Sequence, residues 1–235
     1  MVEIDKGVEI CDLGLWIPKY SILAFADFHL GYNFSLIEKG IYVPQNQIKD
    51  TLERLEKTFR LLNKKPKKII LLGDLKHDFG NLPFEVYREI QRFISFLLKW
   101  CEEIILIKGN HDTTVPKYVK IKKFYKFKEF LFCHGDVLPD KTLLKNIKTI
   151  IMGHLHPTVT LTDDFVSEKV KVFVKSKYKF KTLIILPAFN LITEGAGFYE
   201  NVACPFIKNL ESEIWAIPEF NTPLYFGKQS NLIKI

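Results

Sequence analysis

The chain has 235 residues, of which 47% are hydrophobic and 14% aromatic, and its formal net charge is +7 at pH 7. This apolar share is enough for a continuous core, so intrinsic disorder is not the expected state. No window approaches the roughly 18 consecutive apolar residues of a transmembrane helix, whereas the positive charge favours polyanionic partners.

The start of the chain and its cysteines predict a cellular location. Residues 1–6 (MVEIDK) lack the charged-then-apolar pattern of a secretory signal peptide. The cysteines are widely spaced and form no paired motif, at Cys11, Cys101, Cys133 and Cys204. Such spacing is typical of a reduced compartment, where thiols act as small apolar core residues. We therefore expect a cytoplasmic protein without membrane attachment.

Strand-like and helical patterns begin to alternate after residue 20. The run 21–26 (SILAFA) predicts a strand that ends at Asp27. Pro44 suits a first helical turn, and apolar residues then recur at intervals of three and four, which predicts a helix. These apolar residues are Ile48, Leu52, Leu55, Phe59 and Leu62.

The alternation continues to residue 112. Residues 69–72 and 104–107 predict two more buried strands, and Pro83 opens a helix between them. The apolar stripe of that helix is predicted to contain Phe84, Tyr87, Ile90, Ile94 and either Leu97 or Leu98. This order of elements predicts a largely parallel sheet covered by helices, with ligands bound at the carboxyl ends of its strands.

The second half has a different pattern. Strand-like runs occupy residues 130–133, 147–152, 170–174 and 183–186, with little helical periodicity between them. We therefore expect a second, mostly antiparallel sheet that packs on the first. Because the sequence shows no repeat, low-complexity tract or linker, residues 1–235 are expected to form one domain.

Histidine is confined to five short motifs. All six histidines lie in Asp27-x-His29, Gly73-Asp74-x-x-His77, Gly109-Asn110-His111-Asp112, His134-Gly135-Asp136 and Gly153-His154-x-His156. Imidazole and carboxylate groups together are typical ligands of divalent metal ions. Because histidine occurs nowhere else in the chain, the set as a whole favours a metal site.

Two of these motifs supply candidate carboxylate ligands. Asp27 and His29 would share a direction if the backbone is extended, so both could reach one ion. Asp74 follows a predicted strand and could bridge two ions with its two oxygens. Taken alone, an aspartate after glycine is explained as well by a turn or a helix cap.

The remaining motifs supply neutral ligands. Asn110 offers a hard oxygen, and the neighbouring His111 could face a substrate, oriented by a carboxylate such as Asp112. His134 follows a strand-like run, whose last residue, Cys133, is expected to point the other way into the core. The pair His154 and His156 could hold neighbouring ions from an extended segment. A lone histidine is more often a packed residue, so the argument depends on the complete set.

The order of these motifs resembles the calcineurin-like metallophosphoesterases. Within that superfamily, the G-D-x-x-H of residues 73–77 is similar to DNA-repair nucleases and differs from the G-D-x-V-D-R of many phosphoprotein phosphatases. The segments 26–31, 39–44, 153–157 and 186–189 resemble the small SbcD-related phosphoesterases, which include bacterial members encoded beside a DNA ligase or an Lhr-type helicase and archaeal stand-alone members. Asn190 departs from the more usual L-P-A-F-G of the bacterial relatives, and the sequence alone gives it no role.

The resemblance implies a fold and a ligand set. The fold would be a four-layer αββα sandwich of two packed mixed sheets flanked by helices, without a capping domain. Two divalent ions are implied, with manganese favoured and iron or zinc compatible. The first would be held by Asp27, His29, Asp74 and His156, and the second by Asp74, Asn110, His134 and His154. His111 would protonate the leaving oxygen, and His77 would position the scissile phosphate or assist His111.

Three functions remain open. The resemblance and the basic balance favour a metal-dependent phosphodiesterase that cleaves DNA, with a helicase, ATPase or ligase among the partners to consider. A phosphodiesterase or phosphatase for cyclic nucleotides or nucleotide-like esters is the second. A non-catalytic scaffold of the same fold is the third, and the intact motif set argues against it. Lysine-dense stretches at 64–68, 117–128 and 169–181 are either solvated strand faces or a groove that follows a nucleic-acid backbone.

Overall fold

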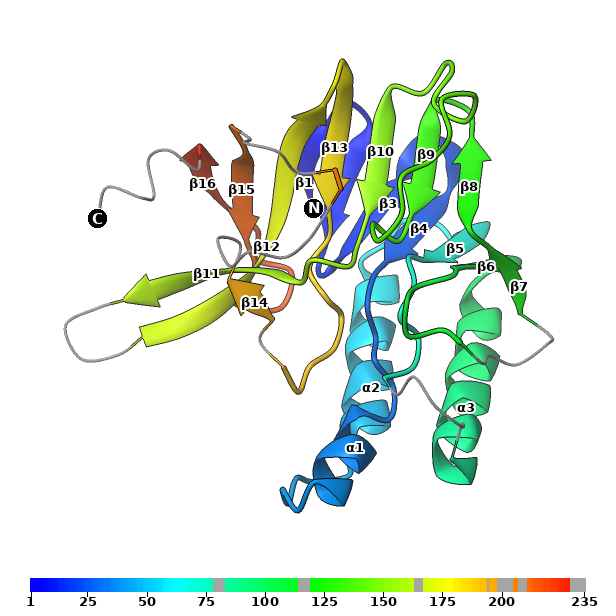
Figure 1. The fold of residues 1–235 in the computed structure, drawn as a ribbon, viewed down its shortest axis with the longest axis vertical. Helices are drawn as coiled ribbons and strands as arrows, with labels where there is room; N and C mark the ends of the chain where they lie inside the picture. Colours follow the sequence, from blue (N-terminus) through cyan, green and yellow to red (C-terminus); the bar gives the residue numbers. More distant parts are fainter. Residues whose placement is uncertain are drawn as a thin grey trace.

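The computed structural model describes residues 1–77, 83–113, 119–162, 167–193, 195–197, 205–206 and 211–228. In these ranges the chain forms two sheets and a group of helices (Figure 1). The first sheet has the order β1 (Val2–Asp5), β2 (Val8–Cys11), β3 (Gly14–Ile17), β4 (Ile22–Phe25), β5 (Lys68–Leu71), β6 (Glu103–Ile107) and β7 (Lys120–Lys122). Strands β1 to β4 pair in antiparallel fashion, whereas β4 to β7 are parallel.

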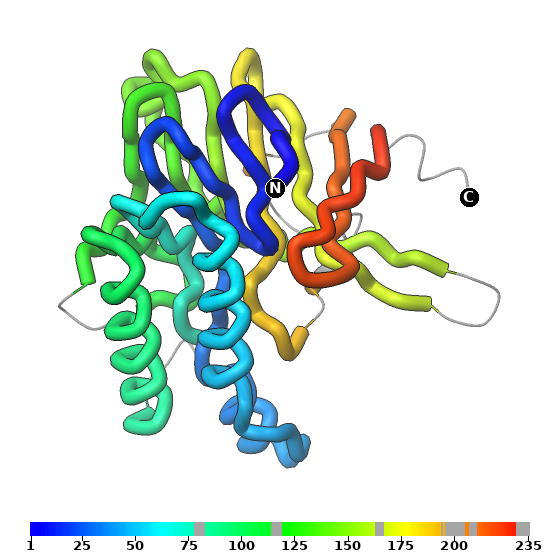
Figure 2. The backbone as a smooth tube through the Cα atoms, turned by 180° about the vertical axis from the view of Figure 1, so that it is seen from behind, coloured from blue at the N-terminus to red at the C-terminus, as the bar shows by residue number. Residues whose placement is uncertain are grey.

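The three strands predicted in the first half are confirmed as β4, β5 and β6, and they are parallel as expected. The meander of β1 to β3 was not predicted, because each strand has only four residues and lacks clear alternation. Figure 2 shows this meander, in blue, lying across the green and yellow strands of the second sheet.

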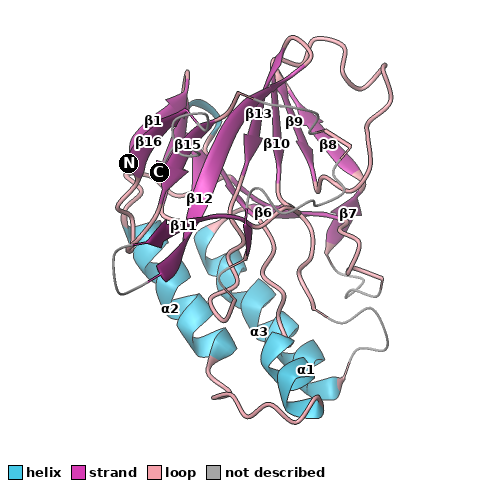
Figure 3. Ribbon diagram, turned by 60° about the vertical axis from the view of Figure 1, so that its left-hand side comes forward, coloured by secondary structure: helices cyan, strands magenta, loops and turns pink. Residues whose placement is uncertain are grey.

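The described segments contain η1 (Pro18–Tyr20), α1 (Tyr32–Glu38), α2 (Gln47–Arg60) and α3 (Phe84–Trp100). Helices α1, α2 and α3 lie together on one side of the first sheet (Figure 3). Helix α2 confirms the predicted helix but begins three residues after Pro44. None of the described helices is long and apolar enough to cross a membrane.

Helix α3 confirms the helix after Pro83, but its apolar stripe differs from the prediction. Phe84 is 68% exposed, because at 100° per residue it lies on the side opposite Val86. Of the two leucines left open, Leu97 is buried and Leu98 is exposed. The buried face consists of Val86, Ile90, Phe93, Ile94 and Leu97.

The second sheet has the order β14 (Ala196–Gly197), β11 (Pro157–Thr162), β12 (Ser167–Tyr178), β13 (Lys181–Ile185), β10 (Thr149–Met152), β9 (Phe130–Cys133) and β8 (Phe124–Phe127). β15 (Glu213–Ala216) pairs with β12 and with β16 (Leu224–Lys228). Most described pairings are antiparallel, as expected, but β9, β10 and β13 pair in parallel. The sheet is therefore mixed.

Alternate residues of the second sheet face two different cores. Phe132, Ile151 and Phe173 pack with the first sheet and its helices. Cys133 and Ile150 point to the outer face, where Leu144 and Ile147 cover them. The predicted orientation of Cys133 is thus confirmed. The α/β class with two packed mixed sheets is also confirmed, although in the described residues the outer face of the second sheet carries turns around residues 141–146 in place of a helical layer.

Candidate metal centre

The predicted ligands meet where strands of both sheets end. The segments after β4 and β5 continue side by side beyond the strands, because the N–H groups of Asp27 and His29 donate to the carbonyls of Gly73 (3.3 Å) and Asp74 (2.9 Å). The segment after β13 joins them through a bridge between Ala26 and Ala188. The centre is therefore built at the seam between the sheets.

Several candidate ligands have a left-handed backbone. The φ angles are 55° at Asp27, 46° at His29, 47° at Asp74, 71° at His154 and 44° at His156. Residues other than glycine rarely adopt this conformation, and it is enriched at functional sites. The assumption that 27–29 and 154–156 are extended was therefore wrong. The chain turns at each ligand, and this turning brings the side chains together.

Each aspartate uses its two oxygens differently. Asp27 accepts the backbone N–H of His154 on Oδ2 (2.8 Å), and Asp74 accepts the backbone N–H of His111 on Oδ1 (2.9 Å). The other oxygens, Asp27 Oδ1 and Asp74 Oδ2, face the imidazoles. Oδ2 is therefore the oxygen of Asp74 that faces the imidazoles of both His29 and His134.

The first group of candidate ligands contains Asp27, His29, Asp74 and His156. The Nε2 atoms of His29 and His156 are 3.2 Å apart. Asp74 Oδ2 lies 3.7 Å from Nε2 of His29, and Asp27 Oδ1 lies 3.6 Å from Nε2 of His156. These four residues are the set that the resemblance assigned to the first ion.

The second group contains Asp74, His134 and His154, so Asp74 is common to both groups. His134 Nδ1 donates to the carbonyl of Leu72 (2.8 Å), so Nε2 is the ring nitrogen that can bind an ion once it gives up its proton. That Nε2 lies 3.4 Å from Asp74 Oδ2, 3.0 Å from Nδ1 of His154 and 2.9 Å from Oδ1 of Asn110. The structure therefore also brings together the four residues expected at the second ion.

Burial and charge set the protonation of the cluster. Burial and the nearby His156 lower the pKa of His29 to about 3, so this imidazole is neutral at pH 7. Burial opposes ionisation of Asp74, but the hydrogen bond with His134, the nearby imidazoles of His134 and His29 and the backbone N–H of His111 together outweigh it and hold the pKa of Asp74 below its usual range. Burial also lowers the pKa of His134, yet Asp74 and Asp27 together raise it to about 9. A cation between the carboxylates would take the place of the His134 proton.

These residues fit a divalent metal. Asp27 is fully buried, and its Oδ1 has no hydrogen-bond partner in the described part of the chain, which is costly for a carboxylate unless a cation is near. Nitrogens of His29 and His156 also face each other at 3.2 Å, an arrangement that a shared cation stabilises. The cluster is thus suited to a divalent ion. The number of ions and their identity stay predictions.

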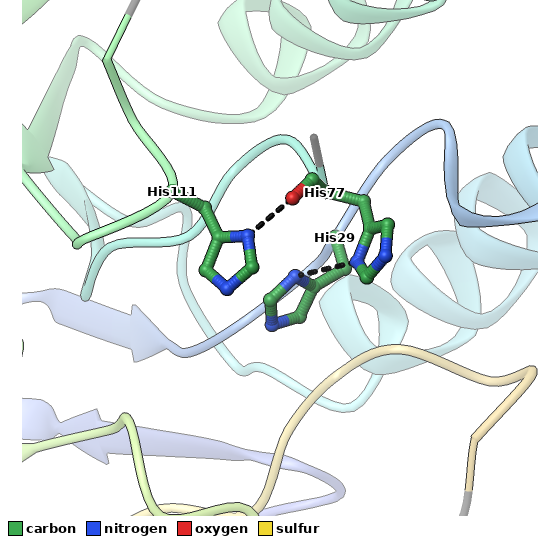
Figure 4. Close-up of side chains that lie close together, drawn as sticks. All are labelled: His29, His77 and His111. Atoms are coloured by element: carbon green, nitrogen blue, oxygen red, sulfur yellow. Dashed lines mark hydrogen bonds between the residues drawn. The ribbon is translucent and has the colours of Figure 1, made fainter. Parts of the chain in front are cut away.

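His77 and His111 lie beside the first group (Figure 4). His77 Nδ1 is 3.4 Å from His29 Nδ1, and His111 Nδ1 contacts the His77 carbonyl. These three histidines also lie close enough to hold a metal ion. Asp112 does not orient His111 as expected, because its carboxylate accepts the backbone N–H groups of Leu75 and Gly109 (3.0 Å each). It fixes the loops that carry Asp74 and Asn110.

A pocket of about 560 Å³ opens beside the centre. Its described lining is His29, Tyr32, His77, His111, His156, Asn190, Ile192, Thr193 and Gly195. Tyr32 meets His77 edge to face, with ring centroids 4.4 Å apart. The sequence did not indicate Tyr32, Ile192 or Thr193 as site residues, and only the unusual Asn190 gave a signal there.

The glycines of the motifs make room for the ligands, which leads to a prediction. A Cβ on Gly109 would overlap the Asp74 carboxylate. We expect Gly109→Ala to weaken metal affinity about 10–100-fold, as supporting contacts of ligands typically do. Calorimetric metal titration measures this, with circular dichroism to verify folding. Gly7→Ala is the control, because a Cβ there meets no atom within 4 Å and the strain of alanine at a φ of 72° falls on the turn between β1 and β2, outside the ligand groups. Unchanged affinity in Gly109→Ala would contradict the prediction.

Comparison with known proteins agrees with this geometry. The model of the calcineurin-like phosphoesterase family matches residues 20–199, so the chain belongs to this family. Family membership and the metal-binding cluster identify a metal-dependent phosphoesterase, which is a hydrolase.

A solved structure shares the fold. A nuclease MPE from Pseudomonas putida superposes with a TM-score of 0.64 at 20% identity, covering 92% of this chain and 93% of that chain. Vacuolar protein sorting 29 from Cryptosporidium parvum gives a TM-score of 0.39 at 14% identity, covering 88% and 97%. No curated protein matches the sequence.

Proposed function

We propose that this protein is a phosphodiesterase of the SbcD-related type, with two manganese ions and DNA as its substrate. The observation that carries the proposal is the pair of ligand groups sharing Asp74, beside a pocket whose wall holds His77 and His111. The described lining of this pocket contains no arginine or lysine. A phosphomonoester carries two negative charges and favours arginine or lysine side chains beside it, whereas a diester carries one negative charge and depends on these side chains less.

The side chains supply positioning and proton transfer. When bound, two divalent ions would polarise the phosphate and activate water as the nucleophile. His111 is placed to protonate the leaving oxygen, because its ring lines the pocket, its Nδ1 donates to the His77 carbonyl and its Nε2 lies 3.9 Å from Asp74 Oδ2. His77 orients both neighbours, His29 through its ring and His111 through its carbonyl.

The lysine-dense stretches give this proposal less support than their composition suggests. Many of their ammonium groups hold the fold together: Lys64 donates to Pro18, Lys126 to Lys145, Lys171 to Ala188, Lys181 to Ile147, and both Lys68 and Lys120 pair with Glu103. These contacts favour the interpretation that these six lysines stabilise strands and turns. Any path for DNA must use the remaining ones.

This sets an expectation for binding. DNA affinity should fall with salt, with log affinity losing about 0.9 per decade of salt for each phosphate contact on duplex DNA. Because many lysines are engaged in the fold, we expect a slope that corresponds to few contacts. Fluorescence anisotropy with labelled DNA across a salt series measures the slope. Affinity that does not change with salt would exclude a polyanionic strand as the ligand.

Substrate assays test the proposal. Protein reconstituted with manganese should cleave a nitrophenyl phosphodiester faster than the matched monoester, and it should cleave single-stranded, duplex or flap DNA. A small-molecule phosphodiesterase is the second candidate, because a pocket of about 560 Å³ has the volume of a typical small-ligand site. Cleavage of nucleotide-like esters without cleavage of any DNA would favour this second function and reject the first.

A further inference from the structure

One wall of the pocket carries a buried amide beside the metal centre. The N–H of Asn190 donates to the carbonyl of Asp27 (3.1 Å), and the N–H of Phe189 donates to the carbonyl of Ala26 (2.8 Å). These bonds place the backbone of Asn190 next to a predicted ligand of the first ion. The residue is only 2% exposed, and it lines the pocket together with His29 and His156.

The two ends of this amide have different surroundings. Asn190 Oδ1 accepts the N–H groups of Ile192 (2.8 Å) and Thr193 (3.4 Å), which closes a tight turn and fixes the side chain. Its Nδ2 has no hydrogen-bond partner among the described residues. A buried donor without a partner is unfavourable and calls for an explanation, such as a ligand that binds there.

A lysine holds this turn from the other side. The ammonium of Lys171 donates to the carbonyl of Ala188 (2.8 Å) and also to that of Asn190. The amide is therefore held at both its backbone and its oxygen, and its nitrogen is the part left for a ligand. Such a donor is preorganised, so it loses little conformational entropy on binding.

We propose that Asn190 Nδ2 donates a hydrogen bond to a phosphate oxygen of the substrate in this pocket. The proposal rests on the phosphodiesterase function. The amide suits an oxygen of a singly charged diester, because it offers a donor without adding a positive charge. The contact exists in the bound substrate as well as in the transition state, so its loss should raise KM and leave kcat nearly unchanged.

Two substitutions separate this role from the turn. Asn190→Ser keeps a side-chain oxygen for the turn but replaces the amide donor by a shorter hydroxyl that ends well before the position of Nδ2, whereas Asn190→Gly removes both. In both variants we expect KM for a nitrophenyl phosphodiester to rise about tenfold or more, as for a lost hydrogen bond to a charged group. The dissociation constant of inorganic phosphate, measured by calorimetry on metal-loaded protein, should rise in parallel. Asn33→Ser is the matched control, because its amide is also buried and unpartnered but does not line the described pocket.

Each result decides the proposal. A normal KM in Asn190→Ser together with a raised KM in Asn190→Gly would show that Asn190 only closes the turn, and would overturn the contact. Normal KM values in both variants would overturn it as well. If both variants unfold, the nuclear magnetic resonance signal of the Asn190 side-chain amide is measured in zinc-loaded wild-type protein. This signal should shift when phosphate is added, and an unchanged signal overturns the proposed contact. If the wild type cleaves no DNA, the DNA proposal fails, while phosphate binding still tests Asn190.

Discussion

Asp74→Ala is expected to lose both metal ions and to reduce diester hydrolysis by about 10³-fold or more, because each ion contributes several kcal/mol to transition-state stabilisation. Asp74 Oδ2 faces His29 in one ligand group and His134 in the other, and no other residue belongs to both of these groups among the described ones. Metal content by mass spectrometry, together with the hydrolysis rate, measures the effect. Asp50→Ala, on the exposed surface of α2, is the control for loss of a carboxylate.

The outcome for Asp74 separates two structures of the centre. Loss of both ions agrees with a shared carboxylate. Two bound ions and near-normal turnover in Asp74→Ala would show that the groups bind metal independently, and would remove Asp74 from its predicted role.

His111→Ala should keep both ions and lose roughly 10²–10⁴-fold in rate on an ester with a poor leaving group. Its Nδ1 is bound by the His77 carbonyl, and it lies outside the two groups that share Asp74. On a nitrophenyl ester the loss should be smaller, because that leaving oxygen needs little protonation. Steady-state rates on both esters and metal analysis of the same samples make the comparison. Equal losses on the two esters, or loss of metal, would contradict the role.

His77→Ala should affect diester cleavage more than monoester cleavage. His77 contacts a predicted ligand, His29, and supports His111, so its removal disturbs how the phosphate is positioned without removing a ligand from the shared groups. Parallel assays on matched nitrophenyl esters measure the difference. An equal loss of rate on both esters would show that His77 only stabilises the loops and does not position the phosphate.

Much of the centre could be predicted because each motif directly follows a buried strand. The runs before Asp27, Asp74 and His134 are short and fully apolar, and the carboxyl ends of adjacent parallel strands meet at one edge. The sequence therefore predicted which side chains come together. It also predicted the two helices whose apolar periodicity covers several turns.

Other features depended on geometry that the sequence does not encode locally. The left-handed backbone at Asp27 and His29 is held by hydrogen bonds to the Gly73 and Asp74 carbonyls of a neighbouring loop, so residue type gives no signal for it. Asp112 holds two loops together, and this could not be predicted because the sequence does not show that the Asp74 loop lies beside Asp112. Asn190 lies after β13, and it reaches the centre through the bridge from Ala188 to Ala26 and the backbone hydrogen bonds of Phe189 and Asn190.

Anomalous diffraction from manganese-loaded crystals tests the account most directly. We expect two peaks roughly 3.5–4 Å apart, as in two-metal phosphoesterase sites, one on either side of Asp74 Oδ2. The first should contact Asp27, His29 and His156, and the second Asn110, His134 and His154. A single peak held by His29, His77 and His111 would contradict the account, because it would place the metal where the substrate is expected to bind.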